Sequence, residues 1–99
     1  MTEAQERPLR VVIVDDEAPA RGRMRDLLAD CAEQTPLTVE GEADSGRAAL
    51  ALLAERKADV VLLDVRMPDM DGLEVAQHIQ KLDEPPTVRV TSHGLLVRP

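Results

Sequence analysis

The chain has 99 residues, with 12 lysines and arginines against 19 aspartates and glutamates and a formal net charge of -7. This length suits one domain, because about 100 residues can bury a core without disulfides or metal ions. Direct binding of nucleic acid or of an anionic membrane surface is not expected, since both would repel so acidic a chain. The acidic clusters suggest a cation as the ligand instead.

Three further features predict a cytoplasmic protein. Cys31 is the single cysteine; it cannot form an internal disulfide, and its place in a helical pattern predicts a small core residue. The first residues, MTEAQERP, lack the basic and apolar regions of a secretory leader. Nowhere do about 18 apolar residues follow one another, as a membrane-spanning helix would require.

The first half of the chain alternates strand and helix patterns. The β-branched run LRVVIV (9–14) predicts a buried strand that stops at Asp15, and a helix follows over 18–31. The segment LTVEGEA (37–43) alternates as an edge strand does, and its acidic residues indicate a solvated edge. In the helix, the inward residues are expected to be Met24, Leu27, Leu28 and Cys31, with Arg21, Arg23 and Arg25 on the exposed side.

The second half repeats the alternation. Ser45 is the expected N-cap of a helix that ends near Lys57, and ADVVLLD (58–64) is a second continuous apolar strand. Asp71, with Glu74 three positions later, predicts the start of another helix, and PPTVRVTS (85–92) supplies the fourth strand. That last helix carries Leu73, Ala76, Ile79 and Leu82.

This order predicts an α/β fold, a doubly wound parallel sheet with right-handed crossovers and helices on both faces. The two most apolar strands, one and three, should be central neighbours, which gives the strand order 2-1-3-4. Ligands of such sheets bind at the carboxyl ends of the strands where the order reverses. Asp64 ends strand three there, and Asp15 and Asp16 end strand one.

Three converging carboxylates must hold either a proton or a cation, because like charges repel at short range. Oxygen ligands without a nearby histidine or cysteine favour Mg²⁺ over zinc. With a metal to neutralise the incoming oxygens, an aspartate can also attack a phosphoryl group. The alternative is that each aspartate merely ends a strand or caps a helix.

The strings VVIVDDE and ADVVLLDVRMPDMDGLEV resemble the receiver domain of two-component response regulators, over roughly residues 9–91. They are most similar to the branch that precedes LytTR-type DNA-binding domains. The resemblance implies the flavodoxin-like receiver fold and a phosphoprotein that acts in phosphorelay signal transduction and transcription regulation. It implies no enzyme activity beyond the receiver's own phosphorylation and dephosphorylation.

The resemblance also assigns roles to individual residues. Asp64 would be the phosphoacceptor, taking a phosphoryl group from a sensor histidine kinase. Asp15, Asp16, Asp64 and the main-chain carbonyl of Arg66 would hold Mg²⁺. The hydroxyl of Thr91 would follow the phosphoryl group.

The end of the chain departs from the receiver pattern. GLLVRP is similar to the family's Gly-Tyr-Leu-x-Lys-Pro, with Arg98 in place of the lysine and Leu95 in place of the aromatic residue. Only six residues lie between Thr91 and Arg98, too few for the about 10 to 12 that a parallel crossover needs. We therefore expect one incomplete receiver domain over 1–99, with the fifth strand and last helices missing or incomplete and a divergent tail at 92–99. An internal deletion or an unrelated tail would each account for this pattern.

Two other functions compete with an impaired phosphoacceptor module. A degenerate receiver fragment could serve only in protein interaction, and the open edge of strand four predicts a homodimer. A hydrolase of the haloacid dehalogenase type also uses a strand-end aspartate as its nucleophile. That family has a second aspartate two positions after the nucleophile, where this chain has Arg66.

Overall fold

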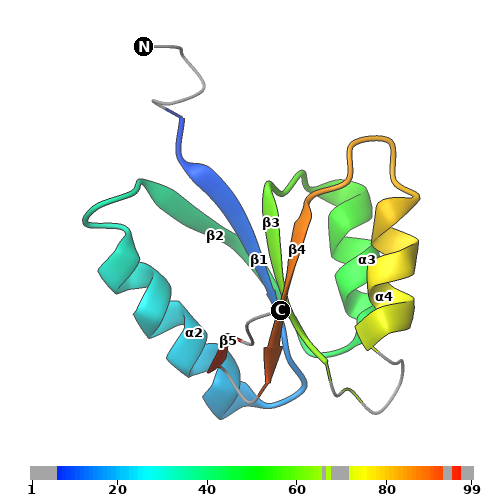
Figure 1. Ribbon diagram of the computed structural model, residues 1–99, viewed down its shortest axis with the longest axis horizontal. Helices are drawn as coiled ribbons and strands as arrows, with labels where there is room; N and C mark the ends of the chain where they lie inside the picture. The colour runs from blue at the N-terminus through cyan, green and yellow to red at the C-terminus, as the bar shows by residue number, and fades with distance from the viewer. Residues whose placement is uncertain (1–6, 66, 68–71, 93–94, 97–99) are drawn as a thin grey trace.

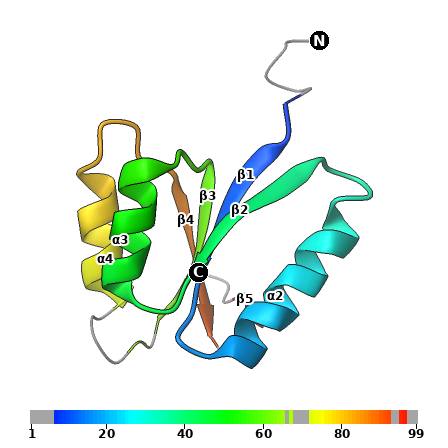
Figure 2. The same ribbon diagram turned by 180° about the vertical axis from the view of Figure 1, so that it is seen from behind.

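The computed structural model describes residues 7–65, 67, 72–92 and 95–96. A single sheet has the strand order β2-β1-β3-β4-β5, with α2 on one face and α3 and α4 on the other (Figure 1, and from behind in Figure 2). The predicted α/β class and the order 2-1-3-4 of four parallel strands are confirmed. The elements are β1 (Leu9–Val14), α2 (Ala18–Cys31), β2 (Leu37–Ala43), α3 (Gly46–Glu55), β3 (Val60–Asp64), α4 (Gly72–Gln80), β4 (Thr87–Ser92) and β5 (Leu95–Leu96).

The central strands are buried on both faces, which explains their continuous apolar sequence. Side chains alternate along each strand, so that Val11 and Ile13 pack toward Met24 of α2. On the opposite face, Val12 and Val14 belong to the cluster that lies under α3 and α4. The larger of the two cores therefore lies beneath the helix pair. No helix in the described part of the chain has both the length and the apolar character needed to cross a bilayer.

Helix α2 corrects the predicted apolar stripe. Ala20 and Met24 are buried, whereas Leu27 is 43% exposed and Cys31 is exposed. The inward positions recur every four residues, so Leu28, half-buried, follows Met24, and Leu27 turns outward. Cys31 is the last residue of the helix, beyond the part that packs on the sheet. The prediction of Cys31 as a core residue was wrong.

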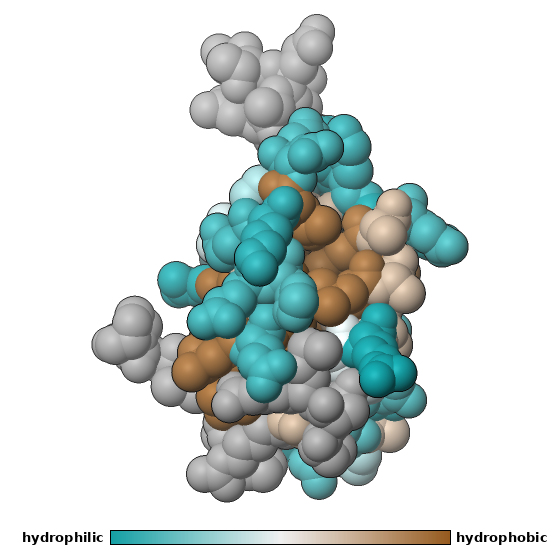
Figure 3. All heavy atoms as spheres, turned by 90° about the vertical axis from the view of Figure 1, so that its right-hand side faces the viewer, coloured by the Kyte–Doolittle hydropathy of each residue, from teal (hydrophilic) through white to brown (hydrophobic). Residues whose placement is uncertain are grey.

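Helix α4 begins and ends close to the expected positions, but its buried face differs. Val75 and Ile79 are fully buried, and Leu73 is 64% exposed. Leu73 lies two residues before Val75, roughly on the opposite side of a helix. Figure 3, which faces α3 and α4, shows apolar surface beside a stripe of hydrophilic residues.

Asp59 joins three strands at the end of the sheet where they begin. Its carboxylate accepts hydrogen bonds from the main-chain N–H of Arg10 at 2.8 Å and from its guanidinium at 3.1 and 3.2 Å. The main-chain N–H of Asp59 donates to the Arg10 carbonyl, and its own carbonyl accepts from the Thr87 N–H. The side chain thus fixes the start of β1 against the segments that lead into β3 and β4.

The fifth strand is short and runs in the opposite direction from its neighbour. β5 pairs antiparallel with β4, Thr91 facing Leu96 and Ser92 facing Leu95. Only two residues separate β4 from β5, a connection that suits an antiparallel hairpin and not a parallel crossover. The predicted incomplete fifth strand is therefore a two-residue hairpin arm. No described strand pairs with the outer edge of β4 from Thr87 to Val90.

Candidate functional site

The structure brings together the three aspartates that the sequence singled out. Asp64 ends β3, and Asp15 and Asp16 directly follow β1, which lies beside β3 in parallel register, Val14 opposite Leu63. One carboxylate oxygen from each aspartate lies within 4.8 Å of the others. The site therefore occupies the carboxyl-terminal edge of the sheet, at the point where the strand order reverses.

The three carboxylates differ in their surroundings. Asp15 and Asp64 are 1% and 3% exposed, and Asp16 is exposed. Oδ1 of Asp15 accepts a hydrogen bond from the Glu17 N–H at 3.0 Å. Oδ2 is buried, and no group among the described residues donates to it. Burial raises the pKa of Asp15, and the charges of Asp64 and Asp16 raise it further, against the lowering effect of the Glu17 N–H.

These features fit a hard divalent cation. The cluster contains only carboxylates, and a buried carboxylate oxygen without a donor is costly unless a cation or proton meets it. The exposure of Asp16 leaves one side open to water, as suits Mg²⁺, which keeps several water ligands. Arg66, whose main-chain carbonyl was predicted as a further ligand, lies outside the described residues.

Thr91 lies beside Asp64 as its direct neighbour across the β3 and β4 pair. Its side chain is 2% exposed, and its carbonyl accepts a hydrogen bond from the Val65 N–H at 3.0 Å. Paired residues of parallel strands project from the same face. The hydroxyl-bearing side chain is thus held next to the strand end that carries Asp64.

Gly72, the first residue of α4, lies against the end of β3. A Cβ atom at this position would lie 2.9 Å from the carbonyl oxygen of Asp64 and 2.9 Å from the Cα of Val65. Such distances do not occur for real Cβ atoms against backbone. The sequence predicted that a helix starts at Asp71, but it did not show that the glycine allows α4 to approach the backbone of Asp64. Asp71 itself lies outside the described residues.

Arg21 also contacts the site, and sequence reasoning missed this role. It was expected on the exposed side of its helix, but its side chain is only 21% exposed. Its Nη1 donates to the main-chain carbonyl of Asp15 at 2.8 Å, and its Nε lies 3.3 Å from Oε1 of Glu42. The available signal was its place six residues after Asp15, in the first turn of the helix that follows, opposite an acidic edge strand.

Comparison with known proteins identifies the family. Residues 11–97 match the family model of the response regulator receiver domain. The chain belongs to the receiver domain family. The predicted resemblance is thereby confirmed, and receivers act with histidine kinases in two-component signalling.

Individual relatives agree with this assignment. The chain is 37% identical to the positive alginate biosynthesis regulatory protein of Pseudomonas aeruginosa, over 92% of this chain and 42% of the relative. It is 38% identical to the sensory transduction protein LytT of Bacillus anthracis, over 81% of this chain and 31% of the relative. Among solved structures, the signal receiver domain of the response regulator NarL from Mycobacterium tuberculosis superimposes with a TM-score of 0.77 and 39% identity. That match covers 86% of this chain and 66% of the NarL receiver.

The chain spans only part of each relative, between 23% and 58% of the length of the curated proteins it matches. Within the receiver, β1 to β4 and their helices carry the acidic site.

Proposed function

We propose that this receiver accepts a phosphoryl group from a sensor histidine kinase on Asp64, with Mg²⁺ held by the acidic cluster. The observation that carries the proposal is the convergence of Asp15, Asp16 and Asp64 within 4.8 Å. The buried, unpartnered Oδ2 of Asp15 supports it, because such an atom suits a cation ligand better than a structural hydrogen bond. A cytoplasmic location and a part in transcription regulation follow from the same proposal.

In the proposed reaction, a carboxylate oxygen of Asp64 attacks phosphorus and the bond from phosphorus to the kinase's histidine nitrogen breaks. The nitrogen keeps the electron pair, and an aspartyl phosphate forms. Asp15, Asp16 and Asp64, with the main-chain carbonyl of Arg66, would hold Mg²⁺, which neutralises charge on the phosphoryl oxygens. Thr91, adjacent to Asp64 in the sheet, would donate a hydrogen bond from its hydroxyl to one of those oxygens. Water later cleaves the acyl phosphate and regenerates the free carboxylate of Asp64. The proposed chemistry is thus limited to phosphorylation and dephosphorylation of the chain's own aspartate.

The response to phosphorylation is proposed to be impaired. A phosphoryl group adds a charge of about -1.5 to -2, which must meet new cationic and hydroxyl contacts before it can bias a second conformation. The chain has Arg98 where the family pattern has a lysine, and it contains no aromatic residue to act as a switch. The short hairpin arm β5 pairs antiparallel with β4, where the family pattern implies a parallel fifth strand. Acceptance of the group is therefore expected to be slow and to cause little rearrangement.

Acetyl phosphate with Mg²⁺, followed by intact-mass measurement, tests the phosphoacceptor directly. We expect a partial, Mg²⁺-dependent gain of one phosphoryl group in the wild type and none in Asp64→Asn. Asp44→Asn is the matched control, because Asp44 is an exposed carboxylate at the same edge of the sheet, outside the cluster. Equal modification of the wild type and Asp64→Asn, or modification that does not need Mg²⁺, would contradict the proposal.

One observation favours a second candidate function, protein interaction without signalling. The outer edge of β4 has no described strand partner from Thr87 to Val90, and unpaired strand edges readily pair with another chain. On this account two copies form a homodimer through β4. Sedimentation equilibrium over a range of concentrations tests this candidate, and a monomer at all concentrations would exclude it.

A further inference from the structure

The loop that carries Asp15 and Asp16 leads from the end of β1 into α2. Glu17, the N-cap of α2, makes no side-chain capping hydrogen bond. In this loop the Asp15 N–H donates to the Ala43 carbonyl and the Glu17 N–H donates to Asp15 Oδ1, each at 3.0 Å. Asp15 is 1% exposed, so its main-chain carbonyl also needs a donor.

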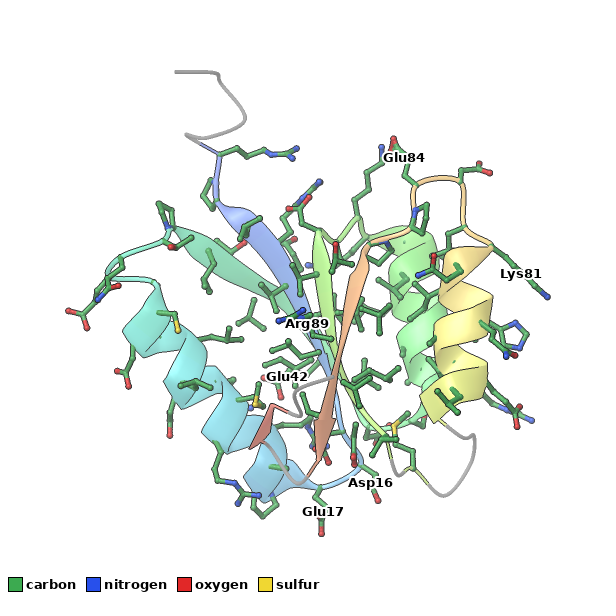
Figure 4. All side chains as sticks on the ribbon, viewed as in Figure 1. Asp16, Glu17, Glu42, Lys81, Glu84 and Arg89 are labelled. Atoms are coloured by element: carbon green, nitrogen blue, oxygen red, sulfur yellow. The ribbon has the colours of Figure 1, made fainter. Side chains whose placement is uncertain are left out.

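Arg21 supplies that donor from the first turn of α2. Its Nη1 donates to the Asp15 carbonyl at 2.8 Å, and its Nε lies 3.3 Å from Oε1 of Glu42. Glu42 is itself bound by Arg25, whose Nη1 lies 2.7 Å from both carboxylate oxygens. Glu42 comes from β2 and lies in the space between the sheet and α2 (Figure 4). The guanidinium is therefore fixed by Glu42 while it binds the main chain of Asp15.

We propose that Arg21 is a positioning residue for the cation site, which it serves by holding the backbone of Asp15. This inference rests on the proposed Mg²⁺ site and extends it to a residue that does not bind the ion. Groups that orient a metal ligand typically change metal affinity about 10-fold to 100-fold when removed. Arg21 meets this description because it binds a ligand residue's own carbonyl and is anchored on a separate strand.

Electrostatics alone predicts the opposite effect. Arg21 is a cation near three carboxylates, so its removal should strengthen the binding of another cation if only charge mattered. A loss of Mg²⁺ affinity on removing this charge would thus reveal the positioning role. Arg25 offers a matched control, because it carries the same charge on the same helix and binds the same Glu42. It makes no described contact with Asp15.

The test is a Mg²⁺ titration followed by backbone amide shifts, at constant ionic strength, for wild type, Arg21→Met and Arg25→Met. We expect Arg21→Met to weaken Mg²⁺ binding at least about 10-fold, and Arg25→Met to stay within about twofold of the wild type. Unchanged or tighter binding by Arg21→Met, beside normal binding by the wild type, would overturn this inference and leave the Mg²⁺ site intact. A wild type that binds no Mg²⁺ would overturn both.

Two further measurements separate positioning from a general loss of structure. Thermal unfolding without Mg²⁺ should give similar midpoints for Arg21→Met and Arg25→Met, since each variant loses its ion pair with Glu42. Arg21→Lys keeps a cationic donor on the same side of α2 and should recover part of the affinity. If Arg21→Lys binds Mg²⁺ no better than Arg21→Met and the midpoint of Arg21→Met falls well below that of Arg25→Met, the role is structural and the inference is wrong.

Discussion

Two buried or half-buried aspartates lie at opposite ends of the sheet, and their surroundings shift their pKa values in opposite directions. At the site, burial raises the pKa of Asp15, and one of its oxygens has no described donor. At the other end, the side-chain hydrogen bond with Arg10 lowers the pKa of Asp59. Both carboxylate oxygens of Asp59 accept hydrogen bonds from Arg10, whereas Oδ2 of Asp15 has no donor among the described residues. This contrast separates a structural carboxylate from one that suits a ligand.

The lowered pKa of Asp59 gives a pH-dependent prediction. Because the folded state holds this proton less tightly than the unfolded chain, the stabilisation is present above the ordinary pKa of about 3.9 and is lost as pH falls through the lowered value. We expect Asp59→Asn to lower the urea midpoint at pH 7 and the difference from wild type to shrink at acidic pH. Urea unfolding of both proteins at several pH values measures this. A difference that stays constant down to pH 3 would show that the Arg10 pair contributes nothing through its charge.

Much of the candidate site could be predicted from single residues. Asp15 and Asp16 follow one apolar strand and Asp64 ends another, so the parallel topology alone brings them to one edge. Arg21 could not be placed in this way, because its direction depends on Glu42, a residue of an edge strand far along the chain. Cys31 and Leu27 were misplaced for a related reason. Apolar spacing shows that a helix has an inner face, but the packing of α2 on the sheet decides which residues lie on it.

At the scale of elements, α4 can pack close to the end of β3 because Gly72 has no side chain. We predict that Gly72→Ala destabilises the protein by about 1 to 3 kcal/mol, as overpacked cores do, because the new Cβ meets the backbone of Asp64 and Val65. Chemical denaturation measures the change. The backbone amides of Asp64 and Val65 should also shift.

Gly22→Ala is the control for that substitution. Gly22 lies within α2, and a Cβ there would meet only the Arg25 guanidinium at an ordinary 3.5 Å. Alanine in a helix interior should then stabilise by about 0.5 to 1 kcal/mol relative to glycine. If the two substitutions had the same effect, the close approach of α4 to β3 would not be the cause.

The elements themselves were largely predictable. The strand and helix boundaries agree with the expected ones within about two residues, and Ser45 caps α3 through a 3.1 Å bond from the Ala48 N–H. Apolar runs and caps are local, so they can be read without the fold. The antiparallel direction of β5 was not predicted. It depends on where β4 ends, which leaves a connection of only two residues before β5.

At the scale of the whole molecule, the fold holds three carboxylates together in a way that costs free energy unless a cation binds. Two of the three are buried, and like charges at this range repel. A ligand that binds only the folded state offsets this repulsion. It stabilises the fold by about 1.4 kcal/mol when its concentration is ten times its dissociation constant. Binding of the proposed cation would therefore couple stability to the acidic edge of the sheet.

The most direct test of this account is the thermal unfolding midpoint of the wild type and of Asp15→Asn, with MgCl₂ and with NaCl at equal ionic strength. The wild type is predicted to unfold at a higher temperature in MgCl₂, by about 5 to 10 °C at ten times the dissociation constant. Asp15→Asn, which keeps the acceptor for the Glu17 N–H, should be the more stable protein in NaCl and gain little from Mg²⁺. A wild-type midpoint that is the same in both salts would contradict the claim that these three aspartates form a divalent cation site.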